Sequence, residues 1–277
     1  MRLGTLGRIA LAAGMGLGGW SCSTMPPPQD QPPQSADAME TFVVFIQEVA
    51  DAALREHAEE IQAITRGALR SIQRVRVVSD ATIAFESGTR VIPEIGLLGL
   101  AAGQRIKVIV DVSRPDWLDS LRRWLPSILA HELCHMIRTR IFIGSVDPTM
   151  PPPPDPKAMS VAAFMAWNRG RPPTLGDFVI HEGCADHFAM EVFGDGPYPW
   201  DSALEGEQLE RWVGHVLEHW EDTDYEIPAW VGGSDEIPRQ AAYAVGYRLV
   251  ADYLAARPGV RPSQLMLESA ATFRSSK

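Results

Sequence analysis

The sequence His131-Glu132-Leu133-Cys134-His135 determines how the rest of the chain is interpreted. On a helix, its two histidines lie one turn apart on the same face. Two imidazoles in that arrangement can bind one zinc ion, and Glu132 lies close enough to take a proton from a water molecule at the metal. The alternative is that these are two ordinary surface histidines on an amphipathic helix, and the rest of the sequence must decide between the two interpretations.

The residues around this motif predict a helix that begins at Pro126. Proline suits a first helical turn because its missing N–H has no partner there. Apolar residues recur at helical spacing on the side opposite the histidines, at Leu129, Leu133, Met136 and Ile137. The histidine face also carries Ser127 and Arg138, so we expect it to form a polar wall of a cleft.

The composition indicates a globular protein of 277 residues, with 45% hydrophobic and 22% charged residues. The formal net charge is −10, and no basic run is present. We therefore expect no binding of nucleic acid or anionic lipid through general charge. Cys22, Cys134 and Cys184 do not form a disulfide framework, and the last two are interpreted as small buried apolar residues.

Residues 1–22 are interpreted as an export signal, with a basic start and a short apolar core. Cys22 precedes a Pro/Gln/Ser tract and resembles the lipidated cysteine of bacterial lipoproteins. A plain secreted protein is the alternative, because Gly19-Trp20-Ser21 departs from the usual residues before such a cysteine. The expected location is periplasmic or outer-surface, with membrane contact only through a lipid anchor at Cys22, or secreted.

The rest of the chain is expected to be a Pro/Gln/Ser linker over residues 23–37 and one domain over 38–277. Helices are predicted over residues 38–74, 116–126, 175–193, 203–220 and 239–256. A last short helix, capped by Ser263, is also predicted. Extended segments are predicted at 75–78, 81–85 and 105–112, and a proline-rich loop at 147–174. A small N-terminal sheet with helices, followed by a mostly helical half, predicts an α+β fold.

A third metal ligand is expected in His181-Glu182-Gly183-Cys184-Ala185-Asp186-His187. Glu182 and Asp186 fall on the apolar stripe of the predicted helix, where an unpaired carboxylate costs several kcal/mol. Zinc for Glu182 and the N–H of a ligand histidine for Asp186 would compensate both. His181 and His187 lie off the stripe and rank lower as ligands. The alternative is an ion pair between Glu182 and Arg138, without metal.

These motifs resemble those of known metallopeptidases. H-E-x-x-H followed by E-x-x-x-D is similar to the gluzincin, thermolysin-like class, which implies Glu182 as third ligand and Asp186 as support for a histidine. More closely, residues 181–189, Phe193-Gly194, Pro199-Trp200, Arg138 and Tyr243 to Tyr247 resemble a bacterial family of predicted Zn-dependent proteases of otherwise unknown function. The resemblance covers most of residues 75–270. It departs at Cys184, where that family usually has leucine.

The favoured function is zinc-dependent hydrolysis of peptide bonds in a peptide or protein substrate. His131, His135 and Glu182 would bind the metal, Glu132 would act as general base, and Tyr243, ahead of Tyr247, would donate to the oxyanion. The strand at 105–112 would offer its edge to an extended peptide. The rival functions are a zinc-binding, non-hydrolytic cell-surface module and a hydrolase of non-peptide amides. His215 and His219 are interpreted as part of a solvated helix face.

Overall fold

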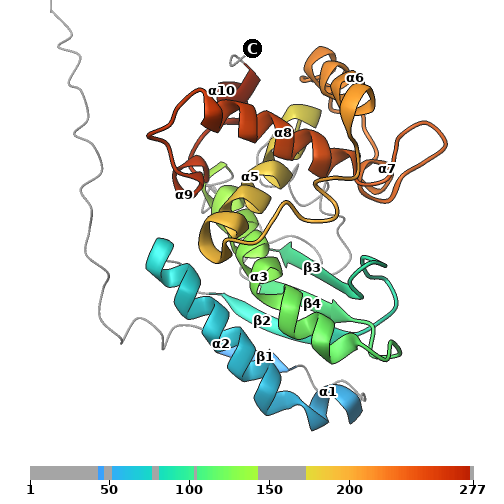
Figure 1. Cartoon of the computed structure of the whole chain (residues 1–277), viewed down its shortest axis with the longest axis vertical. Coiled ribbons are helices and arrows are strands. Elements are labelled where there is room, and N and C mark those ends of the chain that lie inside the picture. The colour runs from blue at the N-terminus through green and yellow to red at the C-terminus, as the bar shows by residue number, and fades with distance from the viewer. Residues whose placement is uncertain (1–42, 47–51, 77–80, 103–104, 143–172, 275–277) are drawn as a thin grey trace, which may run out of the picture. The chain divides into compact units, whose positions relative to one another are not determined.

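The computed structural model describes residues 43–46, 52–76, 81–102, 105–142 and 173–274 (Figure 1). The strands are β1 (Val43–Ile46), β2 (Thr82–Ser87), β3 (Leu97–Ala102) and β4 (Arg105–Val110). The helices are α1 (Ala52–Glu56), α2 (Ala58–Val75), α3 (Trp117–Phe142), α5 (Leu175–Phe193), α6 (Gly206–Glu218), α7 (Ile227–Gly232), α8 (Ala241–Ala255), α9 (Pro262–Leu265) and α10 (Ala270–Arg274). The described strands all precede α3, and the α+β prediction is confirmed.

The four strands form one sheet in the order β1-β2-β4-β3. β1, β2 and β4 are parallel neighbours, whereas β3 pairs antiparallel with β4, with Gly99 opposite Val108. β3 is therefore one of the two edge strands, with β1 at the other edge, and β4 is paired on both sides. The prediction that residues 105–112 offer a free edge is wrong. The Leu-Leu-Gly-Leu-Ala-Ala sequence of β3 has neither alternation nor β-branched residues, so its strand conformation depends on pairing with β4.

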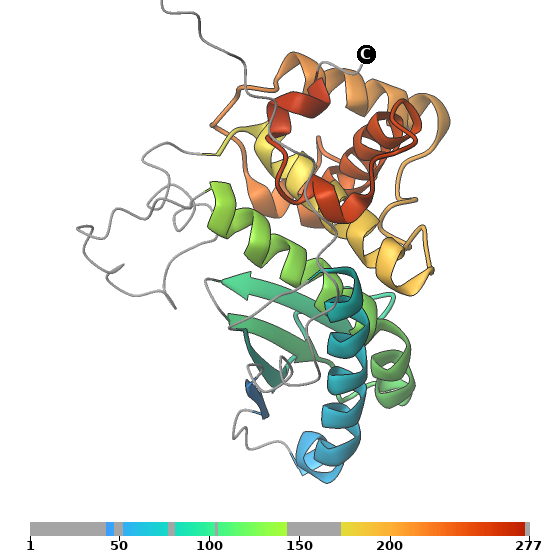
Figure 2. The same ribbon diagram turned by 90° about the vertical axis from the view of Figure 1, so that its left-hand side faces the viewer.

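One face of the sheet is covered by α2 and α3, which Figure 2 shows on the same side of the strands. The residues of β4 alternate in burial, and Ile106, Val108 and Val110 are fully buried. Lys107, on the opposite side of that strand, pairs with Glu86 of β2 at 3.0 Å. The buried face of this sheet and the two helices form the N-terminal part of the hydrophobic core.

The predicted helix over residues 38–74 is wrong in its first part. Residues 43–46 form a strand, and the first described helix begins at Ala52. The sequence Val-Val-Phe-Ile of β1 is rich in residues that favour strands, and its pairing with β2 outweighs the helical spacing of its apolar residues. Arg76 has an extended backbone after α2, and residues 77–80 lie outside the described residues.

The prediction that a helix ends at Pro126 is also wrong, because α3 runs unbroken through this residue. Proline in a helix interior costs about 3 kcal/mol through its missing N–H and a steric clash. Leu125 and Leu129 on either side of it are fully buried, so burial of both halves of α3 offsets this cost. The carboxylate of Asp116, the first residue of that predicted helix, accepts two hydrogen bonds from Arg114.

The C-terminal half is helical, as predicted, and α5 has the predicted bounds. A capping box joins Thr174 and Asp177 at its start, and Gly194 ends it in the left-handed conformation, with φ of 70°. α6 and α8 begin two or three residues later than predicted, and the prediction that Ser263 caps the last short helix is wrong. Ser263 lies inside α9, where its N–H donates to Glu191 at 2.6 Å.

Helix α5 packs chiefly against α8 and α3. At the crossing of α5 and α8, Gly183 and Gly246 allow the two backbones to touch. A Cβ atom at Gly246 would lie 2.9 Å from the Gly183 nitrogen and still closer to the carbonyl oxygen of Val179. This crossing fixes the position of α8 over the residues of α5 that carry the site.

Among the described residues, no helix combines the length and apolar character needed to cross a bilayer. The predicted export signal and linker, and all but the last residues of the loop at 147–174, lie outside those residues.

Candidate metal centre

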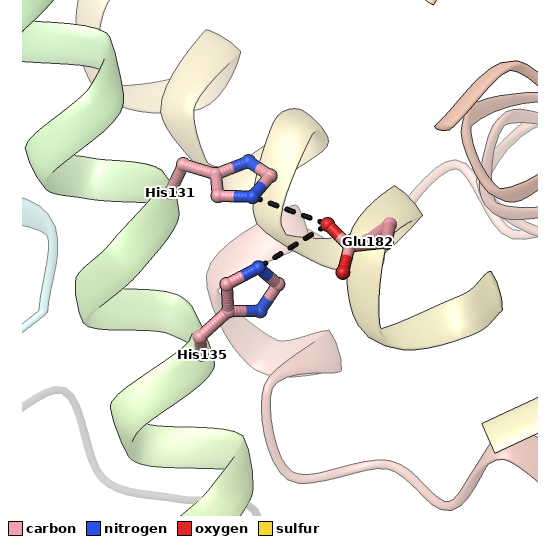
Figure 3. A group of neighbouring side chains, drawn as sticks. All are labelled: His131, His135 and Glu182. Carbon is pink, nitrogen blue, oxygen red and sulfur yellow. Dashed lines mark ion pairs between the residues drawn. The ribbon is translucent and has the colours of Figure 1, made fainter. Parts of the chain in front are cut away.

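Two helices from different parts of the chain bring three side chains together (Figure 3). His131 and His135 lie one turn apart on α3, and their rings are 4.4 Å apart between centroids. Glu182 projects from α5 towards both of them, with its Oε2 atom 3.3 Å from the Nε2 atom of each histidine. All three side chains are buried, and their candidate ligand atoms lie within 4.8 Å of one another.

The donor set fits a zinc ion in both chemistry and spacing. Ligand atoms about 2.0–2.1 Å from a tetrahedral zinc are about 3.3–3.4 Å from each other, which is the separation of Glu182 from the two histidines. Glu182 Oε2 has no well-formed hydrogen bond with any described residue. A buried carboxylate oxygen directed at two imidazole nitrogens, with no donor of its own, is the arrangement that a cation would satisfy.

A hydrogen-bonded group behind His131 fixes its orientation. The Nδ1–H of His131 donates to Asp186 Oδ1 at 2.7 Å, which leaves Nε2 directed at Glu182. The indole N–H of Trp200 donates to the same oxygen at 3.1 Å. Asp186 therefore holds the imidazole in the tautomer that a metal ligand needs, and Trp200 in turn holds Asp186.

The charges in this region depend on one another. Burial lowers the pKa of His131, but Asp186, Glu182 and Glu132 outweigh it and raise that pKa well above its usual value. Burial raises the pKa of Glu182, but His135 and His131 outweigh it and lower the pKa well below its usual value. These directions favour an ionised Glu182 carboxylate beside a positively charged His131 imidazole.

A second buried acid, Asp201, lies beside Asp186 and was not anticipated from the sequence. The N–H of Tyr198 donates to its Oδ2 at 2.8 Å, and the carboxyl group also contacts Asp186. Burial and then the neighbouring Asp186 charge raise the pKa of Asp201 well above its usual value. Its position directly after Pro199-Trp200 was the available signal, because Trp200 belongs to the motif that resembles the known family.

Glu132 is enclosed between α3 and the edge strand β3. Its carboxylate accepts a hydrogen bond from the N–H of Ala101 and lies against the backbone of Gly99. Burial raises its pKa, although the two histidines partly oppose that effect. A carboxyl group with a raised pKa beside candidate metal ligands is suited to act as a general base.

A cavity of about 550 Å³ opens over these residues. Its polar floor includes His131, Glu132, His135 and Glu182, and Tyr243 of α8 forms part of its wall. Apolar side chains from β3, α5, α7 and the segment before β3 form much of the remainder, among them Ile92, Leu98, Leu100, Phe178, Ile227 and Val231.

One side of the cavity is bridged by an ion pair. Arg239, in the wall of the cavity, makes two hydrogen bonds to Glu94 at 2.6 and 2.8 Å. This pair joins the segment before β3 to the segment before α8.

The other residues singled out from the sequence take different places. Arg138 donates to the carbonyl oxygen of Leu265 at 2.6 Å and so ties α3 to α9, while Glu182 faces the histidines. His181, ranked low as a ligand, lines the cavity and stacks on His135 at 4.0 Å between ring centroids. The signals for it were its position directly before Glu182 and its place in the motif 181–189.

Of the remaining residues, Tyr243 lines the cavity with the three candidate ligands, and the others do not. Tyr247 stacks on His187 at 4.4 Å between ring centroids, whereas Tyr243 lies 6.1 Å from the His131 ring. The ring of His215, on α6, lies 4.4 Å between centroids from that of His219, the C-cap residue of this helix, and His219 pairs with Asp222 at 2.7 Å on the exposed surface.

The comparisons with known proteins concern the C-terminal part of the chain. No curated protein and no solved structure matches the chain. Residues 162–275, less than half of the chain, match the model of a family described as predicted Zn-dependent protease (DUF2268). This segment contains Glu182, Asp186 and Tyr243, while the H-E-x-x-H motif precedes it. From residue 162 onwards, the chain is thus similar to a family of predicted Zn-dependent proteases, as its sequence motifs indicated.

Proposed function

We propose that the protein is a zinc-dependent peptidase. One observation carries the proposal: three buried ligand atoms, from His131, His135 and Glu182, converge at the floor of a cavity with the Glu132 carboxylate beside them. A zinc ion held by these residues would supply a Lewis acid that polarises a carbonyl group and lowers the pKa of a water molecule. Every other requirement of the reaction falls to side chains that already line the cavity.

Glu132 is the general base of this proposal. It takes a proton from the attacking water molecule and later passes that proton to the leaving amine. The hydrogen bond from Ala101 N–H and the enclosure by α3 and β3 hold its carboxylate in place. Since burial favours the protonated form, Glu132 accepts a proton more readily than an exposed glutamate does.

Tyr243 is the proposed hydrogen-bond donor to the oxyanion. Burial, followed by the nearby carboxylates Glu182 and Asp186, raises the pKa of this phenol well above its usual value. Tyr243 therefore keeps its proton at neutral pH and donates it in a hydrogen bond rather than losing it. Donors of this kind typically contribute about 3 kcal/mol to stabilisation of the transition state.

The edge strand β3 favours an extended peptide as substrate. The carbonyl oxygen of Leu97 accepts from Ile92 N–H, and the N–H of Ala101 donates to Glu132, so the odd-numbered residues direct these groups away from β4. In an antiparallel strand every second residue points its backbone groups the same way. Gly99, between them, therefore offers its N–H and C=O to a peptide backbone, and the apolar cavity receives an apolar side chain.

A zinc-binding module without hydrolytic activity and a hydrolase of non-peptide amides are the alternatives. The enclosed base argues against the first, because a purely structural zinc site needs no carboxylate at Glu132. The strand edge at the cavity argues for a peptide rather than a small amide. We further propose that the protein is exported, with a lipid anchor at Cys22 as its contact with a membrane, and that it binds no nucleic acid.

The test compares Glu132→Gln with Glu182→Ala. Glu132→Gln preserves shape, so it should keep about one zinc per chain and its melting temperature, while cleavage of a peptide library falls about a hundredfold or more. Glu182→Ala should lose both metal and stability, because zinc binding contributes to folding. Glu218→Gln, on the exposed surface of α6, is the matched control and should change nothing. Wild-type cleavage rates in Glu132→Gln would refute the peptidase proposal.

A further inference from the structure

The position of Glu132 depends on a missing side chain in the neighbouring strand. Gly99 of β3 lies opposite Val108 in the sheet, and its Cα hydrogen faces α3 rather than solvent. A Cβ atom built there would lie 2.7 Å from Glu132 Cγ and 2.8 Å from Cδ, and closer still to Oε1. The three nearest heavy atoms all belong to Glu132, so this carboxylate occupies the space of the absent side chain.

The backbone itself does not demand glycine at this position. Gly99 is not among the described residues with positive φ, and it is paired in a regular strand. Glycine in a strand interior loses more conformational freedom on folding than alanine does. Alanine at position 99 would therefore be favoured by the backbone, and the obstacle to it that the structure shows is the Glu132 carboxylate.

Two residues of β3, Gly99 and Ala101, thus act on the Glu132 carboxylate in different ways. Ala101 donates its backbone N–H to Glu132, which draws the carboxylate against the strand. Gly99 has no side chain, which leaves the space that the Glu132 carboxylate occupies. Glu132 is only 6% exposed, so it has little solvent-filled space into which to retreat.

We propose that Gly99 is a positioning residue, whose missing side chain sets the place of the Glu132 carboxylate beside the metal ligands. The packing claim stands on the contacts alone, whereas its catalytic consequence rests on the proposed function. Under that function Gly99 also offers its backbone groups to the peptide, so the same residue sets the distance between the base and the substrate backbone. A larger residue at position 99 would move the Glu132 carboxylate away from the substrate backbone without touching His131, His135 or Glu182.

A double-mutant cycle on stability tests the packing claim. Gly99→Ala should lower the melting temperature by roughly 4–8 °C in the wild-type background, where the new methyl group meets Glu132. In the Glu132→Ala background the same change should raise it by roughly 1–4 °C, because the space is free and the unfolded chain loses freedom. Gly67→Ala, at an exposed helical position with no atom within 4 Å, should shift both backgrounds equally.

An equal shift from Gly99→Ala in both backgrounds would overturn the proposal. If Gly99→Ala alone does not fold, folding of the Gly99→Ala/Glu132→Ala variant supports the proposal, and failure of that variant overturns it. The cycle is measured with and without zinc, so its outcome does not depend on hydrolysis.

A kinetic measurement then tests the catalytic consequence. With a peptide that the wild type cleaves, Gly99→Ala should retain about one zinc per chain and lose kcat by roughly tenfold or more. Unchanged kcat, at full zinc content, would overturn this consequence. If the wild type cleaves no peptide at all, the proposed function fails, while the stability cycle still decides whether Gly99 positions Glu132.

Discussion

The crossing of α5 and α8 predicts a large effect from a single methyl group. In Gly246→Ala the new Cβ would lie nearer to Val179 O and Gly183 N than the 3.0 Å limit that real Cβ atoms respect. Both neighbours are backbone atoms, so the helices must separate by roughly 1 Å. Overpacking of this kind costs about 3 kcal/mol at the upper end, and the helix propensity of alanine returns about 1 kcal/mol. The net loss of stability should be about 2 kcal/mol.

Thermal unfolding provides the assay for this substitution. For a domain of this size, about 2 kcal/mol corresponds to a fall of roughly 4–8 °C in Tm. Gly214→Ala is the matched control, because it makes the same change in exposed α6 with no atom within 4 Å. It should raise Tm by roughly 2–4 °C through helix propensity alone. If Gly246→Ala is as stable as Gly214→Ala, the contact between the two backbones is not as close as described.

Three further predictions concern the metal and the N-terminus. Asp186→Asn should weaken zinc binding by about 10- to 100-fold, measured by competition with a chelating dye, while Asp235→Asn on the exposed surface leaves it unchanged. The pKa of His131 is raised in the folded protein, so we expect this imidazole to carry a second proton that must leave when zinc binds. Calorimetry in buffers of different ionisation enthalpy should therefore find about one proton released per zinc. For the same reason, the zinc affinity should fall as pH decreases. Unchanged heats across those buffers would contradict the proton assignment. Cys22→Ser should abolish membrane association in the native host, and unchanged fractionation would favour a plain secreted protein.

The fold was predictable where local pattern and tertiary environment agree. Residues 175–193 carry a cap at each end and a buried stripe, and α5 has the predicted bounds. The prediction fails where pairing with a distant segment outweighs local preference: β1 has apolar residues at helical spacing, and β3 has no strand pattern at all. Pro126 was taken as a helix start because the burial of its neighbours could not be seen from the sequence.

The residues of the candidate site were also predictable only in part. The H-E-x-x-H spacing and the buried stripe of Glu182 and Asp186 singled out the residues that the structure brings together. Gly99 and Asp201 escaped attention, because a glycine that admits a carboxylate and an acid that contacts another acid leave no periodic signal. The edge of the sheet was assigned to the wrong strand for the same reason that β3 was missed.

The candidate ligands are divided between α3 and α5, so under the proposed function the metal affinity reports how well these two helices are packed together. α3 alone offers only the pair His131 and His135, and Glu182 reaches them only after α5 has packed against α3. By thermodynamic linkage, any free energy that the docked state gains or loses is passed on to the metal affinity. A substitution at a buried residue that is not itself a candidate ligand, such as Cys134 of α3 or Cys184 of α5, would therefore weaken zinc binding before it visibly unfolded the chain.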